Sequence, residues 1–334
     1  MNQELVPKIA EVNLAKPETD FIENIYNDVN VVIGDESAVV SQIENLVNSH
    51  TEPLPDNFQS FKTLMADTSV SGVVVRGLEL PLEMPDTPEL YQPAESAEIF
   101  RFDFSQLVLS SIIGASFGTT HVRGGRILCD VFPKQGYETK SDSAFGSDHD
   151  FDFHVDGVVH PDTTPDVFSL HCLRNILNIP TLMSDIDFSK LSLNAQTFLT
   201  QNVFRIYYES ISETSHSIVS PIIRHPGSKQ QTIHYYGKTK VGIDETADDK
   251  YKIQDALDEF DQHLQQRAVP VSLTPGEIMF VNNRNCVHGR PAFSPSDIPK
   301  EKQRWLKRLH TATRAPLVNR INEQGGDRIL VSRS

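Results

Sequence analysis

The stretch Phe151-Asp152-Phe153-His154-Val155-Asp156-Gly157 decides how this chain is organised. Phe151 and Phe153 alternate with other residues, and this period of two predicts a short β-strand with one buried face. Residues two apart in a strand point the same way, so His154 and Asp156 are expected to project side by side. An imidazole and a carboxylate placed in this way can take two adjacent coordination positions on one metal ion.

A third ligand must come from a distant part of the chain, and the best candidate is His288, which follows the apolar run 278–281. Two histidines and one carboxylate on one face of an octahedron leave three positions open, as in non-haem Fe(II) oxygenase sites. The H-x-D pair alone is a weak signal, because twelve histidines and forty-five acidic residues produce such pairs by chance. A purely structural role for these residues therefore stays open at this point.

The composition argues against several classes of partner. The chain has 334 residues, of which 38% are hydrophobic and 22% charged, as is ordinary for a globular protein with a substantial core. Its net charge of −15 provides no basic surface for nucleic-acid phosphates or for an anionic membrane. We therefore expect neither a nucleic-acid nor a membrane partner, and the sequence indicates no oligomeric state.

The cysteines and the N-terminus predict a cytoplasmic location. Cys129, Cys172 and Cys286 are far apart and odd in number, which fits reduced thiols better than a disulfide framework. No basic segment followed by an apolar run marks a signal peptide, and no stretch approaches the roughly 18 apolar residues of a membrane span.

The order of the expected elements predicts one domain over residues 1–334, with a helical N-terminal part and an insert around 184–270. Apolar spacing of three and four predicts helices over residues 39–47, 58–65 and 255–266. The apolar runs predict buried strands over residues 70–75, 167–173 and 278–281. Residues 184–214 are expected to be helical, and the polar tail after Pro316 is expected to be loosely ordered. Many short strands interrupted by helices predict a mostly β fold, a double-sheet jelly roll flanked by helices.

Six stretches of the sequence, in order, resemble a known family. They are residues 71–77, 125–133, 153–156, 165–175, 273–293 and 304–308. Together they resemble the clavaminate synthase-like Fe(II)/2-oxoglutarate oxygenases, a branch of the taurine dioxygenase-like superfamily that includes hydroxylases of free asparagine, arginine and lysine. The resemblance covers residues 71–308 and implies a double-stranded β-helix, or jelly-roll, core.

The resemblance implies a role for seven residues. His154, Asp156 and His288 would be the catalytic iron ligands, with 2-oxoglutarate and O2 as cosubstrates. Arg304 would bind the distal carboxylate of 2-oxoglutarate, and Thr181 would make a second contact to it. A planar guanidinium suits a carboxylate because it can donate two parallel hydrogen bonds.

The two remaining residues would contact the substrate. Arg308 lies where family members place an arginine for the substrate's α-carboxylate. Asp244 matches a position in a mobile lid whose acid pairs with a cationic side chain in the arginine hydroxylase.

Two departures from the family pattern bear on these roles. Many relatives carry H-x-E, whereas this chain has Asp156, which is one methylene shorter and can still bind a metal. The gap from His288 to Arg304 is two residues longer than in the family. Related halogenases have Gly or Ala at the acidic position, so Asp156 argues against halogenation.

The leading hypothesis is an Fe(II)/2-oxoglutarate-dependent hydroxylase of a free L-amino acid, with release of succinate and CO2. An arginine for the carboxylate and an acid near the far end favour a basic substrate, and lysine is preferred to arginine. The alternatives are an arginine or asparagine hydroxylase, a metal-binding jelly-roll protein without oxidation chemistry, and a zinc hydrolase that uses the same three ligands.

Overall fold

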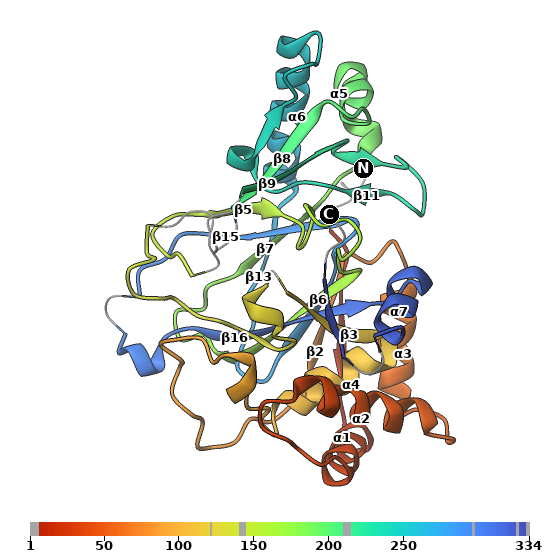
Figure 1. The fold of residues 1–334 in the computed structure, drawn as a ribbon, viewed down its shortest axis with the longest axis vertical. Coiled ribbons are helices and arrows are strands. Elements are labelled where there is room, and N and C mark those ends of the chain that lie inside the picture. The colour runs from red at the N-terminus through yellow and green to blue at the C-terminus, as the bar shows by residue number, and fades with distance from the viewer. Residues whose placement is uncertain are drawn as a thin grey trace, which may run out of the picture.

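The computed structural model describes residues 7–120, 122–139, 145–209, 215–295, 298–324 and 327–331, and these residues form mostly sheet with helices around it. Figure 1 shows the N-terminal helices at the bottom, the helices from the region of residues 193–267 at the top, and the two main sheets between them. The predicted mostly β fold with flanking helices is thus confirmed, while the division into a single domain with an insert stays a prediction.

The larger sheet is built from strands that are far apart in the sequence. Its order is β1-β2-β14-β6-β16-β3-β17, and β4 pairs with β16. The bounds are β1 Ile9–Asn13, β2 Gly72–Arg76, β14 Ile278–Asn282, β6 Val167–Arg174, β16 Trp305–Ala312, β3 Ala115–Thr119, β17 Ile329–Leu330 and β4 Cys129–Val131. The three predicted apolar strands are confirmed as β2, β6 and β14, and they lie side by side in this sheet.

The smaller sheet carries the H-x-D stretch. Its order is β13-β7-β15-β5, with β13 Val269–Val271, β7 Thr181–Asp185, β15 Cys286–Arg290 and β5 Phe151–His154. Met183 of this sheet packs in one buried cluster with Phe168, Leu170 and Leu306 of the larger sheet. The inner faces of the two sheets therefore share a core, and side chains that project between them form the interior where the site lies.

The N-terminal helices cover the outer face of the larger sheet. They are α1 Lys16–Asp28, α2 Glu36–Ser49, α3 Asp56–Ala66 and α4 Asp103–Ile113. The amide of Gln106 in α4 donates to the carbonyl oxygens of Ser169 in β6 and Lys307 in β16, at 3.3 and 3.1 Å. Helix α4 thereby ties together the two strands at the centre of the sheet, and the helices predicted over 39–47 and 58–65 are confirmed as α2 and α3.

The helical prediction for residues 184–214 is largely wrong. Among the described residues of this range, only α5, Leu193–Phe198, is an α-helix, with a single 3-10 turn at Phe188–Lys190 before it. Helix α5 packs against α6, Lys250–Arg267, which confirms the helix predicted over 255–266. A separate sheet, β12-β8-β9, follows, with β8 Phe204–Glu209, β9 Ser215–Ser220 and β12 Val241–Ile243. Strands β10 Ile223–Arg224 and β11 Thr232–Ile233 form a short hairpin-like pair. Phe204 and Ile206 are both fully buried, so a period of two, not a helical period, governs this segment.

The prediction of a loose tail after Pro316 is also wrong for the described residues. Helix α7, Ala315–Asn322, buries Leu317 and Ile321, and β17 pairs in parallel with β3. Arg328 forms an ion pair with Glu44 of α2 at 2.7 Å. These few apolar and charged contacts fix a segment whose overall composition is polar.

Among the described residues, no helix combines the length and the apolar character that crossing a bilayer requires.

A buried histidine lies on the outer face of the larger sheet. His171 in β6 is 1% exposed, and neither of its ring nitrogens has a hydrogen-bond partner in the part of the chain that the structure describes. Burial, with a smaller contribution from the charge of Lys307, lowers the pKa of His171 to about 3. The unfolded chain binds a proton at this residue below about pH 6.5, whereas the folded chain does not.

We predict that His171 makes the protein sensitive to acid. Its contribution to stability is complete above about pH 6.5 and is lost as the pH falls toward 3, because only the unfolded state gains the proton. In His171→Met the free energy of unfolding should fall less steeply below pH 6.5, by up to about 1.4 kcal/mol per pH unit. Urea unfolding at pH 7, 6 and 5 measures the slope, with His149→Gln as the exposed control. Equal slopes in His171→Met and the parent would contradict the prediction.

Candidate active site

The three predicted metal ligands come together between the sheets. His154 ends β5 and pairs in register with His288 of β15, and Asp156 follows β5 by two residues. The distances from Asp156 Oδ1 to the Nε2 atoms of His154 and His288 are 3.6 and 3.8 Å. One ligand atom from each residue lies within 4.8 Å of the others, and all three residues are buried. The donor set, two imidazoles and one carboxylate, fits an Fe(II) ion with open positions.

The two imidazoles are oriented by their neighbours. Nδ1 of His154 is 2.9 Å from the carbonyl oxygen of Asp152, so it donates a proton there and leaves the lone pair of Nε2 facing the cluster. The ring of His288 lies 4.1 Å from the ring of Phe168 in β6. Burial and the proximity of His154 hold the pKa of His288 well below its usual range, so the imidazole is neutral, as metal binding requires.

Asp156 divides its two carboxylate oxygens between different partners. Oδ1 faces the two imidazoles, whereas Oδ2 accepts hydrogen bonds from Arg308 Nη1 at 3.1 Å and from His310 Nε2 at 2.8 Å. Burial alone would raise the pKa of Asp156, but the charge of Arg308 and the hydrogen bond from His310 outweigh it and hold the pKa well below its usual range. The carboxylate is therefore ionised, with one oxygen fixed and the other directed at the proposed ligand cluster.

His310 is a site residue that the sequence interpretation missed. It lies in β16 two residues after Arg308, so the two side chains share a face of the strand. Arg304 and Arg308 were both singled out at an even spacing, and the same period of two leads directly to residue 310. This signal was present in the sequence and was not used.

Arg304 lies immediately before β16 with a buried guanidinium that lacks a protein carboxylate. Its Nε has no hydrogen-bond partner, and no ion pair involves it among the described residues. Burial and the charge of Arg290 lower the pKa of Arg304 to about 10. A buried cation without an anion is costly unless a ligand supplies one, so this position fits a dicarboxylic acid such as 2-oxoglutarate.

Thr181 lies on the same side of the site as Arg304. It is the first residue of β7. The next residue, Leu182, pairs with Gly289 of β15, so the antiparallel register places Thr181 beside Arg290. Arg290 is also the cation whose charge acts on Arg304. Thr181 therefore lies beside a cation whose charge also reaches Arg304, the other residue predicted to contact 2-oxoglutarate.

Two predicted substrate contacts have other partners. Arg308 donates to Asp156, as described above, and so acts on a proposed metal ligand besides any contact to substrate. The carboxylate of Asp244 accepts hydrogen bonds from Arg205 Nη2 and Thr246 Oγ1, both at 2.6 Å. Asp244 is therefore already paired with a cation of the protein. Among the described residues, it is not part of the His154, Asp156 and His288 cluster.

A small pocket opens beside the carboxylate of Asp156. Its volume is about 60 Å³, and Arg308 and His310 contribute to its wall. The rest of the lining is mostly apolar or neutral: Thr119, Val122, Gly157, Val158, Val159, His160, Thr163, Pro165 and Tyr236. The pocket therefore provides a place beside the proposed metal ligands for a small organic group.

Comparison with known proteins supports the resemblance seen in the sequence. Residues 196–310 match the model of the taurine catabolism dioxygenase TauD, TfdA family. An enduracididine beta-hydroxylase from Streptomyces hygroscopicus is 26% identical over 73% of this chain and 78% of its own length. An L-ornithine/L-arginine 3-hydroxylase from Catenulispora acidiphila is 23% identical over 71% of this chain and 75% of its own.

Solved structures share the fold over nearly the whole chain. An asparagine oxygenase in complex with Fe(II), 3-hydroxyasparagine and succinate is 20% identical, with a TM-score of 0.80 over 97% of this chain and 99% of that one. The non-heme iron oxygenase OrfP in complex with Fe and alpha-ketoglutaric acid is 20% identical, with a TM-score of 0.77 over 96% and 99%. The resemblance to Fe(II)/2-oxoglutarate-dependent dioxygenases is confirmed, and these two solved structures hold iron together with succinate or alpha-ketoglutaric acid.

The hydrogen bond from His310 predicts an indirect effect on metal binding. His310→Phe removes a partner of Asp156 Oδ2 while filling a similar volume, so the carboxylate should lose its fixed orientation. We expect Co(II) affinity to fall roughly 10- to 100-fold, as for other residues that orient a ligand, measured by calorimetric titration. His154→Ala, which removes a proposed ligand, should weaken binding further. Unchanged affinity in His310→Phe would show that Asp156 does not depend on this contact.

Proposed function

We propose that this relative of the TauD/TfdA dioxygenases hydroxylates an unactivated C–H bond of a free L-amino acid. The observation that carries the proposal is the buried His154, Asp156 and His288 cluster, with ligand atoms within 4.8 Å of one another, together with the unpaired buried guanidinium of Arg304. Bound Fe(II) with 2-oxoglutarate and O2 supplies the oxidation of the C–H bond, with release of succinate and CO2. The protein supplies binding, orientation and charge.

Each residue has a distinct part in this proposal. His154, Asp156 and His288 hold the metal, and Arg304 with Thr181 binds the distal end of 2-oxoglutarate. Arg308 holds Asp156 Oδ2 and lines the small pocket beside it, where the substrate would lie. The neutral imidazole of His288 and the ionised Asp156 are the protonation states that this arrangement needs.

The amino acid class rests on the named relatives, which act on enduracididine, ornithine or arginine, and asparagine. The sequence-based preference for lysine finds no support among them. Asp244, the acid invoked for a basic side chain, is paired with Arg205, which weakens the structural reason for choosing a basic substrate. Arginine, ornithine and asparagine are therefore the first candidates, ahead of lysine.

We also propose that the two main sheets form a double-stranded β-helix. The central strands β14, β6 and β16 of one sheet face β7, β15 and β5 of the other across a shared core. Such a closed pair of sheets brings residues from β5, β15 and β16 to a single interior site, although they are far apart in sequence.

A spectroscopic titration tests the proposed metal and cosubstrate sites. Without oxygen, Fe(II) and 2-oxoglutarate added to the parent protein should give a visible metal-to-ligand charge-transfer band. Asp156→Ala should lose the band, because it removes the only carboxylate among the proposed ligands. Metal binding without a band in the parent would favour the non-oxidative metal-binding protein or the zinc hydrolase instead.

The unpaired guanidinium predicts a second, separable effect. Arg304→Gln should raise the concentration of 2-oxoglutarate needed for half of the charge-transfer signal roughly 10- to 100-fold, the effect of losing a charged hydrogen bond. Arg304→Lys should need a concentration between those of the parent and Arg304→Gln. Lys302→Gln, a change of an exposed lysine, should need the same concentration as the parent. An unchanged 2-oxoglutarate titration in Arg304→Gln would place the cosubstrate elsewhere.

The reaction itself is tested by a screen of the free L-amino acids for substrate-dependent formation of succinate. We expect one or a few of them to accelerate succinate release and to gain one oxygen atom by mass spectrometry. A complete screen without acceleration would contradict the proposed substrate class.

A further inference from the structure

Thr119 is the last residue of strand β3, on the inner face of the larger sheet. It lies two residues after Phe117, which pairs in register with His310 of β16, so the side chains of these three residues share one face. Thr119 also lines the small pocket beside Asp156, as Arg308 and His310 do. It is therefore part of the wall of the space next to the proposed metal ligands.

The hydroxyl group of Thr119 is buried without a partner. Thr119 is 4% exposed, and its Oγ1 has no hydrogen-bond partner within the part of the chain that the structure describes. Burying an unpaired hydroxyl costs free energy, which a bound ligand can recover by pairing with it. Rotation about the Cα–Cβ bond moves the hydroxyl among staggered positions, so it can turn to a ligand without a change of the backbone.

The backbone around Thr119 is fixed by its neighbours. Leu330 of β17 pairs with Thr119, and the N–H of Thr120 donates to the carbonyl oxygen of Leu330 at 3.0 Å. The N–H of Val122 donates to the carbonyl oxygen of Thr119 at 2.9 Å. The polar groups of the main chain at this point thus have partners in the protein, in contrast to the hydroxyl of the side chain.

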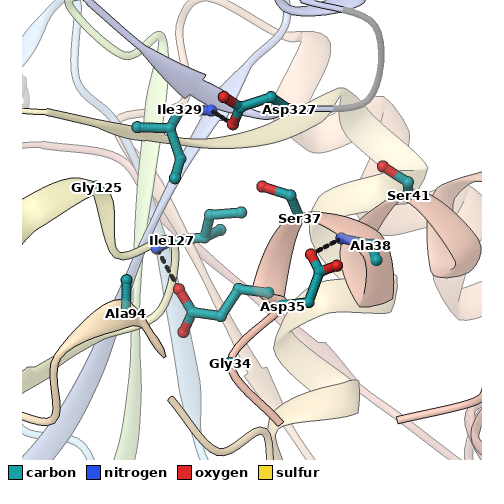
Figure 2. Close-up of a pocket in the computed structure, with 11 residues that line it drawn as sticks. Gly34, Asp35, Ser37, Ala38, Ser41, Ala94, Gly125, Ile127, Asp327 and Ile329 are labelled. Carbon is teal, nitrogen blue, oxygen red and sulfur yellow. Dashed lines mark hydrogen bonds between the residues drawn. The ribbon is translucent and has the colours of Figure 1, made fainter. Parts of the chain in front are cut away.

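A larger pocket, at the start of α2, lacks this feature. Its volume is about 500 Å³, and Figure 2 shows hydrogen bonds to its carboxylates. Asp35 accepts a hydrogen bond from the N–H of Ala38 at 2.9 Å, and Asp327 accepts one from the N–H of Ile329 at 3.0 Å. No described residue of its lining has a buried side-chain nitrogen or oxygen without a partner. Size alone therefore does not indicate a ligand, whereas the unpaired hydroxyl of Thr119 does.

The charges in the wall of the small pocket favour an anion. Both oxygens of Asp156 are in use, one facing the two imidazoles and the other accepting from Arg308 and His310. A metal ion bound at the first oxygen offsets the negative charge of Asp156, which leaves the positive charge of Arg308 beside the pocket. A carboxylate suits both this charge and the hydroxyl of Thr119, which can donate a hydrogen bond to a carboxylate oxygen.

We propose that Thr119 donates a hydrogen bond to a carboxylate of the substrate and is a specificity-determining residue of this site. The inference rests on the proposed function for the identity of the substrate as an amino acid. The pocket of about 60 Å³ compares with the roughly 30 Å³ that one water occupies in the liquid, so it admits one end of an amino acid and not the whole molecule. A carboxylate held there gives the rest of the amino acid a fixed orientation beside the proposed metal ligands.

Removing the hydroxyl tests whether it is unpaired. Thr119→Val replaces the hydroxyl with a methyl group of similar size, so the melting temperature without ligand should equal or exceed that of the parent, because no hydrogen bond is lost. Thr120→Val, the same change at the next residue, which is exposed, is the matched control. A melting temperature of Thr119→Val below those of the parent and the control would show that the hydroxyl has a partner in the folded protein, and this would overturn the proposal.

A binding test uses acetate and methylammonium as probes, with Fe(II) and saturating 2-oxoglutarate and without oxygen. Acetate should raise the melting temperature of the parent, of Thr119→Ser and of Thr120→Val more than methylammonium does, because acetate carries the carboxylate that the hydroxyl binds. Thr119→Val should lose most of this preference. No acetate preference in the parent, or an equal preference in Thr119→Val, overturns the proposal.

A kinetic test uses whichever L-amino acid releases succinate in the screen. Thr119→Val should raise the KM for that amino acid roughly 10- to 100-fold, the effect of losing a hydrogen bond to a charged group, and leave the KM for 2-oxoglutarate within about twofold. Thr119→Ser, which keeps a hydroxyl, should restore most of the affinity. An unchanged amino acid KM in Thr119→Val overturns the role of Thr119, whereas failure of the whole screen overturns the proposed function and leaves the acetate comparison to decide on Thr119.

Discussion

The two-sided binding of the Asp156 carboxylate is the interaction on which the rest of the site depends. One oxygen lies 3.6 and 3.8 Å from the nitrogens of His154 and His288, and the other is held by Arg308 and His310. A buried carboxyl would otherwise favour its neutral form, and a neutral acid is a poor metal ligand. Arg308 and His310 of strand β16 therefore keep the Asp156 carboxylate, which follows strand β5, ionised and fixed in orientation.

Strand β16 can do this because its two faces have different tasks. Lys307 points outward and forms a buried ion pair with Asp103 of α4 at 2.7 Å, beneath the N-terminal helices. Arg308 and His310 point inward to the cluster, and Arg304 precedes them with the same period of two. The helices that cover the outer face thus hold the strand whose inner face carries three cationic or polar groups of the site.

Much of this could be predicted from the sequence, and the failures have physical causes. His154 and Asp156 were found because a strand places residues two apart on one face, and His288 because it follows an apolar strand. The ion pair between Lys307 and Asp103 was missed because it joins a strand to a distant helix, and no local pattern reports such a meeting. Asp244 shows the converse problem: an acid is visible in the sequence, but the cation that it meets, Arg205, is decided by the pairing of β8 with β12.

The central claim is that residues from β5 and β15 hold one ferrous ion. X-ray absorption at the iron K-edge of the Fe(II)-loaded protein counts the imidazoles bound to the metal through their outer-shell scattering. The account predicts two imidazoles in the parent and one in His288→Ala, with Asp156 providing an oxygen ligand in both. An iron shell without imidazole in the parent, or two imidazoles remaining in His288→Ala, would contradict it.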